Sequence, residues 1–173
     1  MNDLYRELAP ITAEAWAEIE EEARSALKAT LAGRRLVDFE GPLGWHASSV
    51  DLGRTEEIDA PASGASARLR RVQPLMEVRV PFEIERKEIE ALSRGARNPE
   101  LDPVVTAARS AALIEDGAIF NGYANSGIDG IGAASAHAPI SLSSDYTHYP
   151  EAAAEAMRVL RNQGIDGPYA IAM

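Results

Sequence analysis

The chain has 173 residues, no cysteine, and a net charge of −10 from 27 acidic and 17 basic side chains. The length fits about one domain, the lack of cysteine excludes a disulfide framework and a thiolate zinc site, and the negative charge opposes nucleic-acid binding. Leu, Ile, Val and Phe together number only 37, against 31 alanines, so large apolar side chains are scarce for a globule that stands alone.

The N-terminal region predicts a long amphipathic helix. Its first residues are too polar for a signal peptide, and no apolar run in the chain approaches a membrane span, so we expect a cytoplasmic protein with no membrane partner. The helix is predicted from about Thr12, a suitable N-cap, to Leu31, with Gly33 as a left-handed stop. Spacings of three and four place one apolar stripe on it, made of Trp16, Ile19, Ala23, Leu27 and Leu31.

A polar stretch follows that cannot fold on a core of its own. A short strand is predicted over 35–39, before the turn at Gly41-Pro42. Residues 46–72 carry few large apolar groups and have a turn-rich tip at 62–66, which indicates a long hairpin arm or extended loop that reaches another subunit. Its basic cluster favours ion pairing between subunits over nucleic-acid binding, and consists of Arg68, Arg70 and Arg71.

The clearest alternation of apolar and polar residues spans 76–85 and predicts a strand with one buried face, with Pro81 at an edge or bulge. A short helix is expected over 87–93, and a long helix over 102–121. The long helix contains two adjacent carboxylates, Glu115 and Asp116. Neighbours on a helix point about 100° apart, so we expect these two to pair with arginines rather than to converge on one catalytic atom.

The last third of the chain is rich in Gly, Ala and Ser. The glycines of 127–132 do not match a phosphate-binding loop. A helix is expected over 150–162, with Gly164 as its stop, and a further strand over 168–173. Because nothing follows that strand, we expect the sequence to be interrupted.

The sequence gives little support for a metal site or for a hydrolase. The three histidines form no HxH or HxxxH pair, so we expect no metal site. A hydrolase that uses Ser143, Asp145 and His148 is an alternative function. No GxSxG motif is present and nothing in the sequence orders a nucleophile, a base and an orienting group, so we favour a protein that is not an enzyme.

Several segments together resemble the encapsulin family of nanocompartment shell proteins. The similarity covers the whole chain in order, in Leu4–Pro10, Trp16–Glu20, Gly33–Asp38, Gly41-Pro42, Asp116, Ile119–Gly122, Gly127–Gly130 and Gly164–Tyr169. The resemblance implies an α+β fold of the HK97 phage-capsid type and a structural protein that self-assembles into a closed icosahedral shell around a cargo enzyme. A viral or prophage capsid protein of the same fold is the other function that this likeness leaves open.

The resemblance also implies a division of the chain. Residues 1–45 would form the N-terminal helix and the first strand of the P-domain, 46–72 the E-loop, 73–122 the P-domain with its long spine helix, and 123–173 the first part of the A-domain. Family members are longer, so we expect the fold to be incomplete at the C-terminus and a complementary C-terminal fragment to be a partner.

A cargo site follows from the same resemblance. The targeting peptide of a cargo enzyme, such as a dye-decolorizing peroxidase or a ferritin-like protein, would lie between the N-terminal helix and the P-domain. The matching positions are Ile19, Ala23 and Leu27 for apolar contact and Arg34 and Asp38 for polar contact. Ordinary helix packing is the alternative role of the first three, and a surface ion pair with each other is the alternative for the last two.

Some relatives hold a flavin with an aromatic pair. By this match the corresponding positions here are Lys87 and Glu90. Neither side chain can stack on a flavin ring as an aromatic would, so we expect no cofactor.

Overall fold

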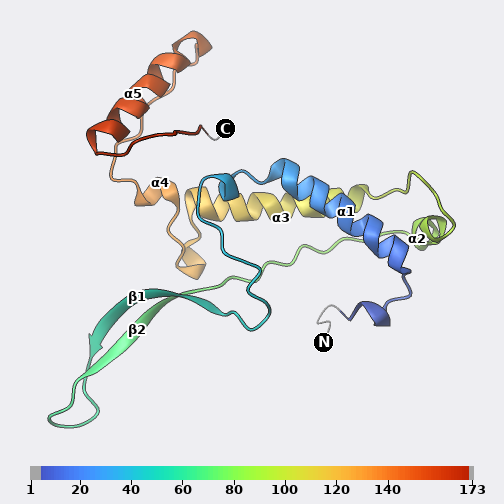
Figure 1. The fold of residues 1–173 in the computed structure, drawn as a ribbon, viewed down its shortest axis with the longest axis horizontal. Coiled ribbons are helices and arrows are strands. Elements are labelled where there is room, and N and C mark those ends of the chain that lie inside the picture. Colours follow the sequence, from blue (N-terminus) through green and yellow to red (C-terminus); the bar gives the residue numbers. More distant parts are fainter. Residues whose placement is uncertain (1–4, 172–173) are drawn as a thin grey trace.

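Two long helices lie side by side at the centre of the molecule (Figure 1). The computed structural model describes residues 5–171. Helix α1 spans Ala13–Thr30 and helix α3 spans Asp102–Asn121, which confirms both predicted helices. The N-cap is also confirmed, because the backbone N–H of Ala15 donates to the Thr12 hydroxyl oxygen at 3.3 Å.

The core lies between these two helices and is built largely of alanine. Its buried apolar residues are Ala15, Ile19 and Ala26 on α1, Leu101 before α3, and Val104, Ala107, Ala108 and Ala112 on α3. Small side chains at a helix–helix contact let the two backbones approach closely. The thin core that the composition predicts is therefore present, and it leaves many larger apolar side chains at the surface.

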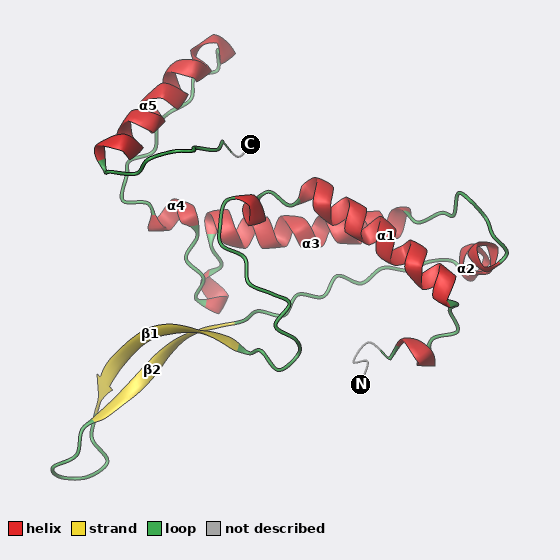
Figure 2. Cartoon of the chain, in the orientation of Figure 1, coloured by secondary structure: helices red, strands yellow, loops and turns green. Residues whose placement is uncertain are grey.

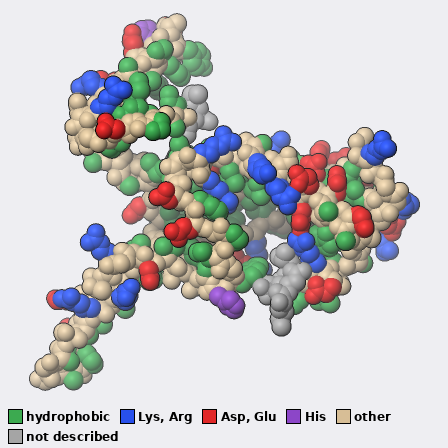
Figure 3. Space-filling model, in the orientation of Figure 1, with side chains coloured by type: hydrophobic (Ala, Val, Ile, Leu, Met, Phe, Trp, Pro, Cys, Tyr) green, Lys and Arg blue, Asp and Glu red, His purple; other side chains and the backbone are tan. Residues whose placement is uncertain are grey.

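A two-stranded antiparallel arm projects from one end of the helix pair (Figure 2). Strand β1 spans Ser49–Ile58 and strand β2 spans Ala67–Pro74, so the predicted hairpin arm is confirmed. Basic and acidic side chains lie along its surface (Figure 3). The arginines of the basic cluster pair with acids of β1 inside the arm itself, as Arg68–Glu57, Arg70–Asp51 and Arg71–Glu56.

The strand predicted over 76–85 is not a sheet strand. Within the described residues the segment runs as an unpaired connection from the arm to helix α2, which spans Arg86–Ser93 (Figure 1). Its apolar side is only half covered, and Val78 and Phe82 remain 43% and 45% exposed. Alternation of apolar and polar residues indicates which side of an extended segment is buried. A β-strand also needs a neighbouring strand to accept and donate its backbone hydrogen bonds.

Two shorter strand predictions are also wrong. After the short helix η2, Gly33–Arg35, the backbone N–H groups of Leu36 and Val37 both donate to Gly33 O, which curls the chain where a strand was expected over 35–39. Residues 168–171 form no strand either, since they pair with no other segment of the described chain; the Tyr169 hydroxyl donates to Ile165 O at 2.7 Å. Residues 172–173 of that prediction lie outside the described residues.

Gly33 does not end α1 as a left-handed cap. Its φ is not positive, and α1 ends when the N–H of Leu31 donates to Leu27 O. The glycine instead lies close against side chains of α3. A Cβ built there would lie 2.6 Å from Ile119 Cδ1 and 3.0 Å from Asp116 Oδ1 on α3.

The chain beyond residue 145 stands apart from the helix pair, whereas Ile131–Ala134 contact α3 (Figure 1). Helix α4 spans Ile131–Ala134, the short helix η4 spans Tyr146–His148, and helix α5 spans Tyr149–Asn162. Gly164 has a φ of 77° after α5, as predicted for its stop. The whole is a mixed arrangement of helices and one small sheet, consistent with the α+β class. Across residues 5–171, no helix has the length and apolar character that a membrane crossing requires.

Candidate functional site

An open groove with a volume of about 850 Å³ runs beside α3, at the base of the arm. Its walls come from the end of α1, the turn after it, the segment 74–78, one side of α3 and residues 128–131. The apolar part of the lining includes Leu27, Val37, Val78, Ile114, Ala118 and Ile128. The volume lies in the range of ligand sites, and the groove is open to solvent rather than a closed cavity.

The groove brings together three of the five predicted cargo residues. Leu27, Arg34 and Asp38 line it. Ile19 does not, because it is 5% exposed and packs in the core with Leu101 and Val104. Ala23 packs against the same core cluster. The apolar stripe of α1 therefore divides, with its first part used for helix packing and Leu27 alone facing the groove.

Arg34 is held by α3 and does not pair with Asp38. Its guanidinium donates to both carboxylate oxygens of Glu115, at 2.5 Å from Nε and 2.7 Å from Nη2. The guanidinium carbon also lies 4.4 Å from the centre of the Phe39 ring, a cation–π contact. The hydrogen bond to Glu115 raises the pKa of Arg34 above its ordinary value. The prediction that Glu115 pairs with an arginine is confirmed.

Asp116 accepts hydrogen bonds from backbone N–H groups and does not pair with an arginine, so the prediction of an arginine partner is wrong for this residue. One carboxylate oxygen accepts from the N–H of Ala32 at 2.9 Å, and the other accepts from the N–H of Gly33 at 2.8 Å. The side chain is nearly buried, with 9% exposed. Two adjacent carboxylates of α3 thus hold the turn after α1. Asp116 binds its backbone and Glu115 binds the side chain of Arg34. This turn forms one wall of the groove.

Two further carboxylates of the groove are free of such bonds. Asp38 and Asp129 both line it and are exposed. Neither has an ion-pair partner among residues 5–171. Asp129 was missed by sequence reasoning, and its position in a Gly-rich stretch gives no local signal that it lies beside α3. Ile114 and Ala118 are four residues apart and so share one side of α3. This spacing is the sequence feature that could have predicted the apolar floor of the groove.

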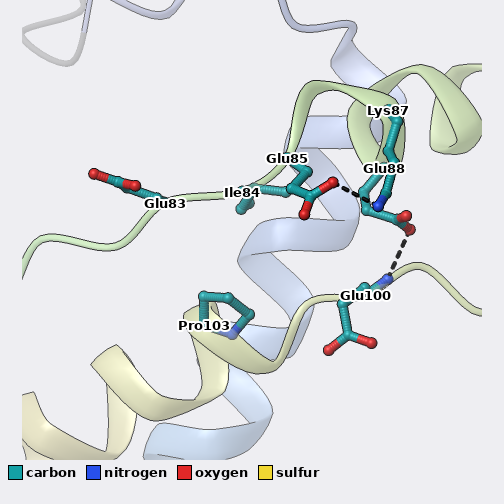
Figure 4. Close-up of a pocket in the computed structure, with 7 residues that line it drawn as sticks. All are labelled: Glu83, Ile84, Glu85, Lys87, Glu88, Glu100 and Pro103. Atoms are coloured by element: carbon teal, nitrogen blue, oxygen red, sulfur yellow. Dashed lines mark hydrogen bonds and ion pairs between the residues drawn. The ribbon is translucent and has the colours of Figure 1, made fainter.

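The residues aligned with a flavin site lie elsewhere, near a second hollow that Lys87 lines (Figure 4). The Lys87 ammonium pairs with Glu85 at 2.5 Å, and this hydrogen bond raises the pKa of Lys87. Glu90 pairs with Arg86 at 2.9 Å. The seven residues around the hollow include no aromatic, and its acids are Glu83, Glu85, Glu88 and Glu100. The expectation that no flavin binds stays a prediction.

The residues of the hydrolase alternative form a local turn. Ser143 Oγ accepts the backbone N–H of Asp145 at 3.0 Å, and Asp145 accepts from both the N–H and the hydroxyl of Thr147. His148 Nδ1 lies 3.5 Å from the same carboxylate. These bonds cap η4 at an exposed surface. In the described part of the chain, no group of three or more His, Cys, Asp or Glu side chains is placed to hold a metal ion.

Comparison with known proteins gives one consistent result. A family described as "Encapsulating protein for peroxidase" matches residues 1–173. The chain is 54% identical to the type 1 encapsulin shell protein of Rhodospirillum rubrum, over 100% of this chain and 64% of the relative. It is 46% identical to that of Mycolicibacterium paratuberculosis and 43% identical to that of Mycobacterium tuberculosis, each over 99% of this chain and 64% of the relative.

The chain thus spans less than two thirds of the length of these relatives. The names of these relatives describe a shell, which is a structural role and agrees with the prediction of a protein that is not an enzyme. None of the three is named as a hydrolase or as a viral capsid protein.

Proposed function

Because the chain belongs to the family of encapsulin shell proteins, we propose that it is a structural subunit of a closed icosahedral shell assembled from many copies. The family match over the whole chain carries this proposal. The thin core supports it, since large apolar side chains such as Leu113, which is 64% exposed, remain open in a single copy. Neighbouring subunits can bury the apolar side chains that are exposed in a single protomer. We propose the bacterial cytoplasm as its location.

The elements fit an HK97-type subunit. In this interpretation α1 is the N-terminal helix, the β1–β2 arm is the E-loop, α3 is the spine helix, and the α4–α5 part begins the A-domain. The exposed arm supports the interpretation, because every residue of β1 is solvent-exposed in the single chain. An arm of this length gains burial only by lying on a neighbour.

The groove beside α3 is the proposed cargo site. A short targeting peptide of a cargo enzyme would lay apolar side chains against Leu27, Ile114 and Ala118. A peroxidase is one candidate cargo, given the description of the family, and a ferritin-like protein is another. Ile19 and Ala23, in this proposal, act indirectly by holding α1 on α3.

A complementary polypeptide segment is the second proposed partner. The segment 76–84 has alternating side chains and no paired strand within residues 5–171, and the exposed side of α3 lies beside it in a hollow lined by Val78, Leu113 and Gly117. An extended segment of this kind is completed by strands that pair with its free edge. The remaining third of a relative's sequence is a natural source of such strands.

The test is assembly with and without that segment. The chain would be expressed alone, and then with the part of the Rhodospirillum rubrum relative that lies outside the match, and each product examined by native mass spectrometry and negative-stain microscopy. We expect closed particles only in the second case. Open aggregates or monomers in both cases would contradict the shell proposal. Closed particles from the chain alone would leave the shell in place and contradict the need for a complementary segment.

A further inference from the structure

The segment before α1, residues 5–11, is a strap that contacts the helix mainly through one side chain. It contains the short helix η1, Arg6–Leu8, and lies next to the first turns of α1 (Figure 1). The Arg6 guanidinium carbon lies 5.3 Å from the centre of the Trp16 ring, and Arg6 Nη2 forms an ion pair with Glu20 Oε1. No residue of the strap is buried, and Leu8 is 78% exposed. Arg6 therefore acts as the latch of the strap.

The hydrogen-bonding groups of this latch are poorly satisfied. Three of its polar atoms are buried and have no hydrogen-bond partner among residues 5–171, namely Arg6 Nε, Trp16 Nε1 and Glu20 Oε1. The ion pair at Glu20 Oε1 therefore lacks the geometry of a hydrogen bond. Buried polar groups without hydrogen bonds destabilise the conformation that buries them. An open strap would return all three atoms to water.

The backbone at the start of the strap is strained. Tyr5, the N-cap of η1, has a φ of 49° and a ψ of 36°, and it is the one non-glycine residue within 5–171 with a positive φ. This left-handed conformation is unfavourable for a residue that has a Cβ atom. The Tyr5 side chain is 58% exposed, so packing does little to offset the strain. Release of the neighbouring Arg6 would let this backbone relax.

From these opposing effects we propose that the strap opens and closes over Trp16, and that the contacts of Arg6 with Trp16 and Glu20 hold it closed. A partly exposed ion pair and a surface cation–π contact are both weak, so unmet hydrogen bonds and backbone strain can balance them. Because salt screens the ion pair, the surface that the start of α1 presents depends on ionic strength. This device requires neither the groove nor assembly into a shell.

Trp16 itself reports the position of the strap. The sequence has two tryptophans, so the substitution Trp45→Phe leaves Trp16 as the single indole fluorophore. Quenching of Trp16 fluorescence by acrylamide is measured for this chain at about 0.05 M and about 1 M salt. We expect the quenching constant to rise with salt as the strap opens. Arg6→Gln, which removes the latch, should show the higher value at both salt concentrations.

Three further variants separate the latch from general effects. Glu20→Gln removes only the ion pair and should raise the ratio of open to closed strap by about two- to five-fold, as for a partly exposed pair. Tyr5→Asn should lower the quenching constant, because asparagine tolerates the left-handed conformation of the closed strap. The matched control is Arg24→Gln, which breaks the ion pair with Glu21 on α1 and should leave the quenching of Trp16 unchanged.

Amide hydrogen exchange along α1 shows whether each variant keeps the helix. Equal quenching of Trp16 in Arg6→Gln and in the protein with Arg6, or no response of the latter to salt, would overturn the proposal. An effect of Arg24→Gln as large as that of Arg6→Gln would assign the change to net charge and not to the latch. Loss of exchange protection throughout α1 in Arg6→Gln would make Arg6 a part of the helix fold, which also contradicts a strap that opens alone.

Discussion

We expect substitution of Asp116 by alanine to lower the free energy of unfolding strongly, although it removes only one carboxylate. Its two carboxylate oxygens each accept one backbone N–H, from Ala32 at 2.9 Å and from Gly33 at 2.8 Å. These bonds tie the turn after α1 to the C-terminal part of α3, 84 residues away in sequence. The turn carries Arg34, so its position also sets one wall of the groove.

The size of the effect follows from these two bonds. A hydrogen bond to a charged acceptor contributes about 1.5–3 kcal/mol, and a buried N–H left without a partner costs a similar amount. The Gly33 bond is buried and the Ala32 bond is partly buried, so water can replace part of the second. We therefore expect Asp116→Ala to lower the free energy of unfolding by about 3 kcal/mol, or the melting temperature by roughly 6–12 °C for a chain of this size.

Urea unfolding followed by far-ultraviolet circular dichroism measures the global effect, and hydrogen exchange at the amides of Ala32 and Gly33 measures the local one. Glu115→Gln is the matched control on the neighbouring position, because it weakens an exposed ion pair to Arg34 and should lose under about 1 kcal/mol. Equal losses for the two variants, with unchanged exchange at Gly33, would refute the reasoning.

Three further outcomes are expected. Gly33→Ala should destabilise the chain by only about 1 kcal/mol in urea, because the added Cβ would lie 2.6 Å from the Ile119 Cδ1 methyl, the end of a side chain that can shift; a loss of about 3 kcal/mol or more would show that Ile119 cannot move. Hydrogen bonds from Thr147 lower the pKa of Asp145, so their stabilisation is present at neutral pH and lost as the pH falls through the lowered value. Thr147→Val should raise the Asp145 pKa in a carboxyl NMR titration, and an unshifted titration would exclude that cause. Ala23→Glu should lower stability in urea while Leu27→Glu weakens peptide binding at nearly unchanged stability, and the reverse result would exchange their assigned roles.

The helices and the arm were predictable because their signals are local. The stripe of α1, its Thr12 cap and the polar hairpin depend on residues within a few positions of one another. Gly33 shows the limit of such signals. A glycine after a helix is typical of a left-handed stop, yet here it is placed by contact with Ile119, far away in sequence.

The candidate site was predictable only in part, for the same reason. Pairing of Glu115 with an arginine could be expected from residue types, since opposite charges leave a signature in the sequence. The bonds that Asp116 accepts could not, because backbone N–H groups are the same at nearly every residue. Asp129 likewise reaches the groove through the fold of a Gly-rich stretch and not through any spacing to Asp38.

The error over 76–85 has a different physical origin, and it bears on function. Alternation was present and the segment is extended beside α3, so the sequence pattern described a strand's side chains correctly. A strand also requires backbone partners, and residues 5–171 provide none for this segment. Under the proposed function, the unpaired backbone and the half-exposed Val78 and Phe82 are the surface that a complementary segment would cover. The same logic applies to the arm, whose apolar side chains are exposed in one copy, and it supports the proposal that other polypeptides cover these surfaces in a shell.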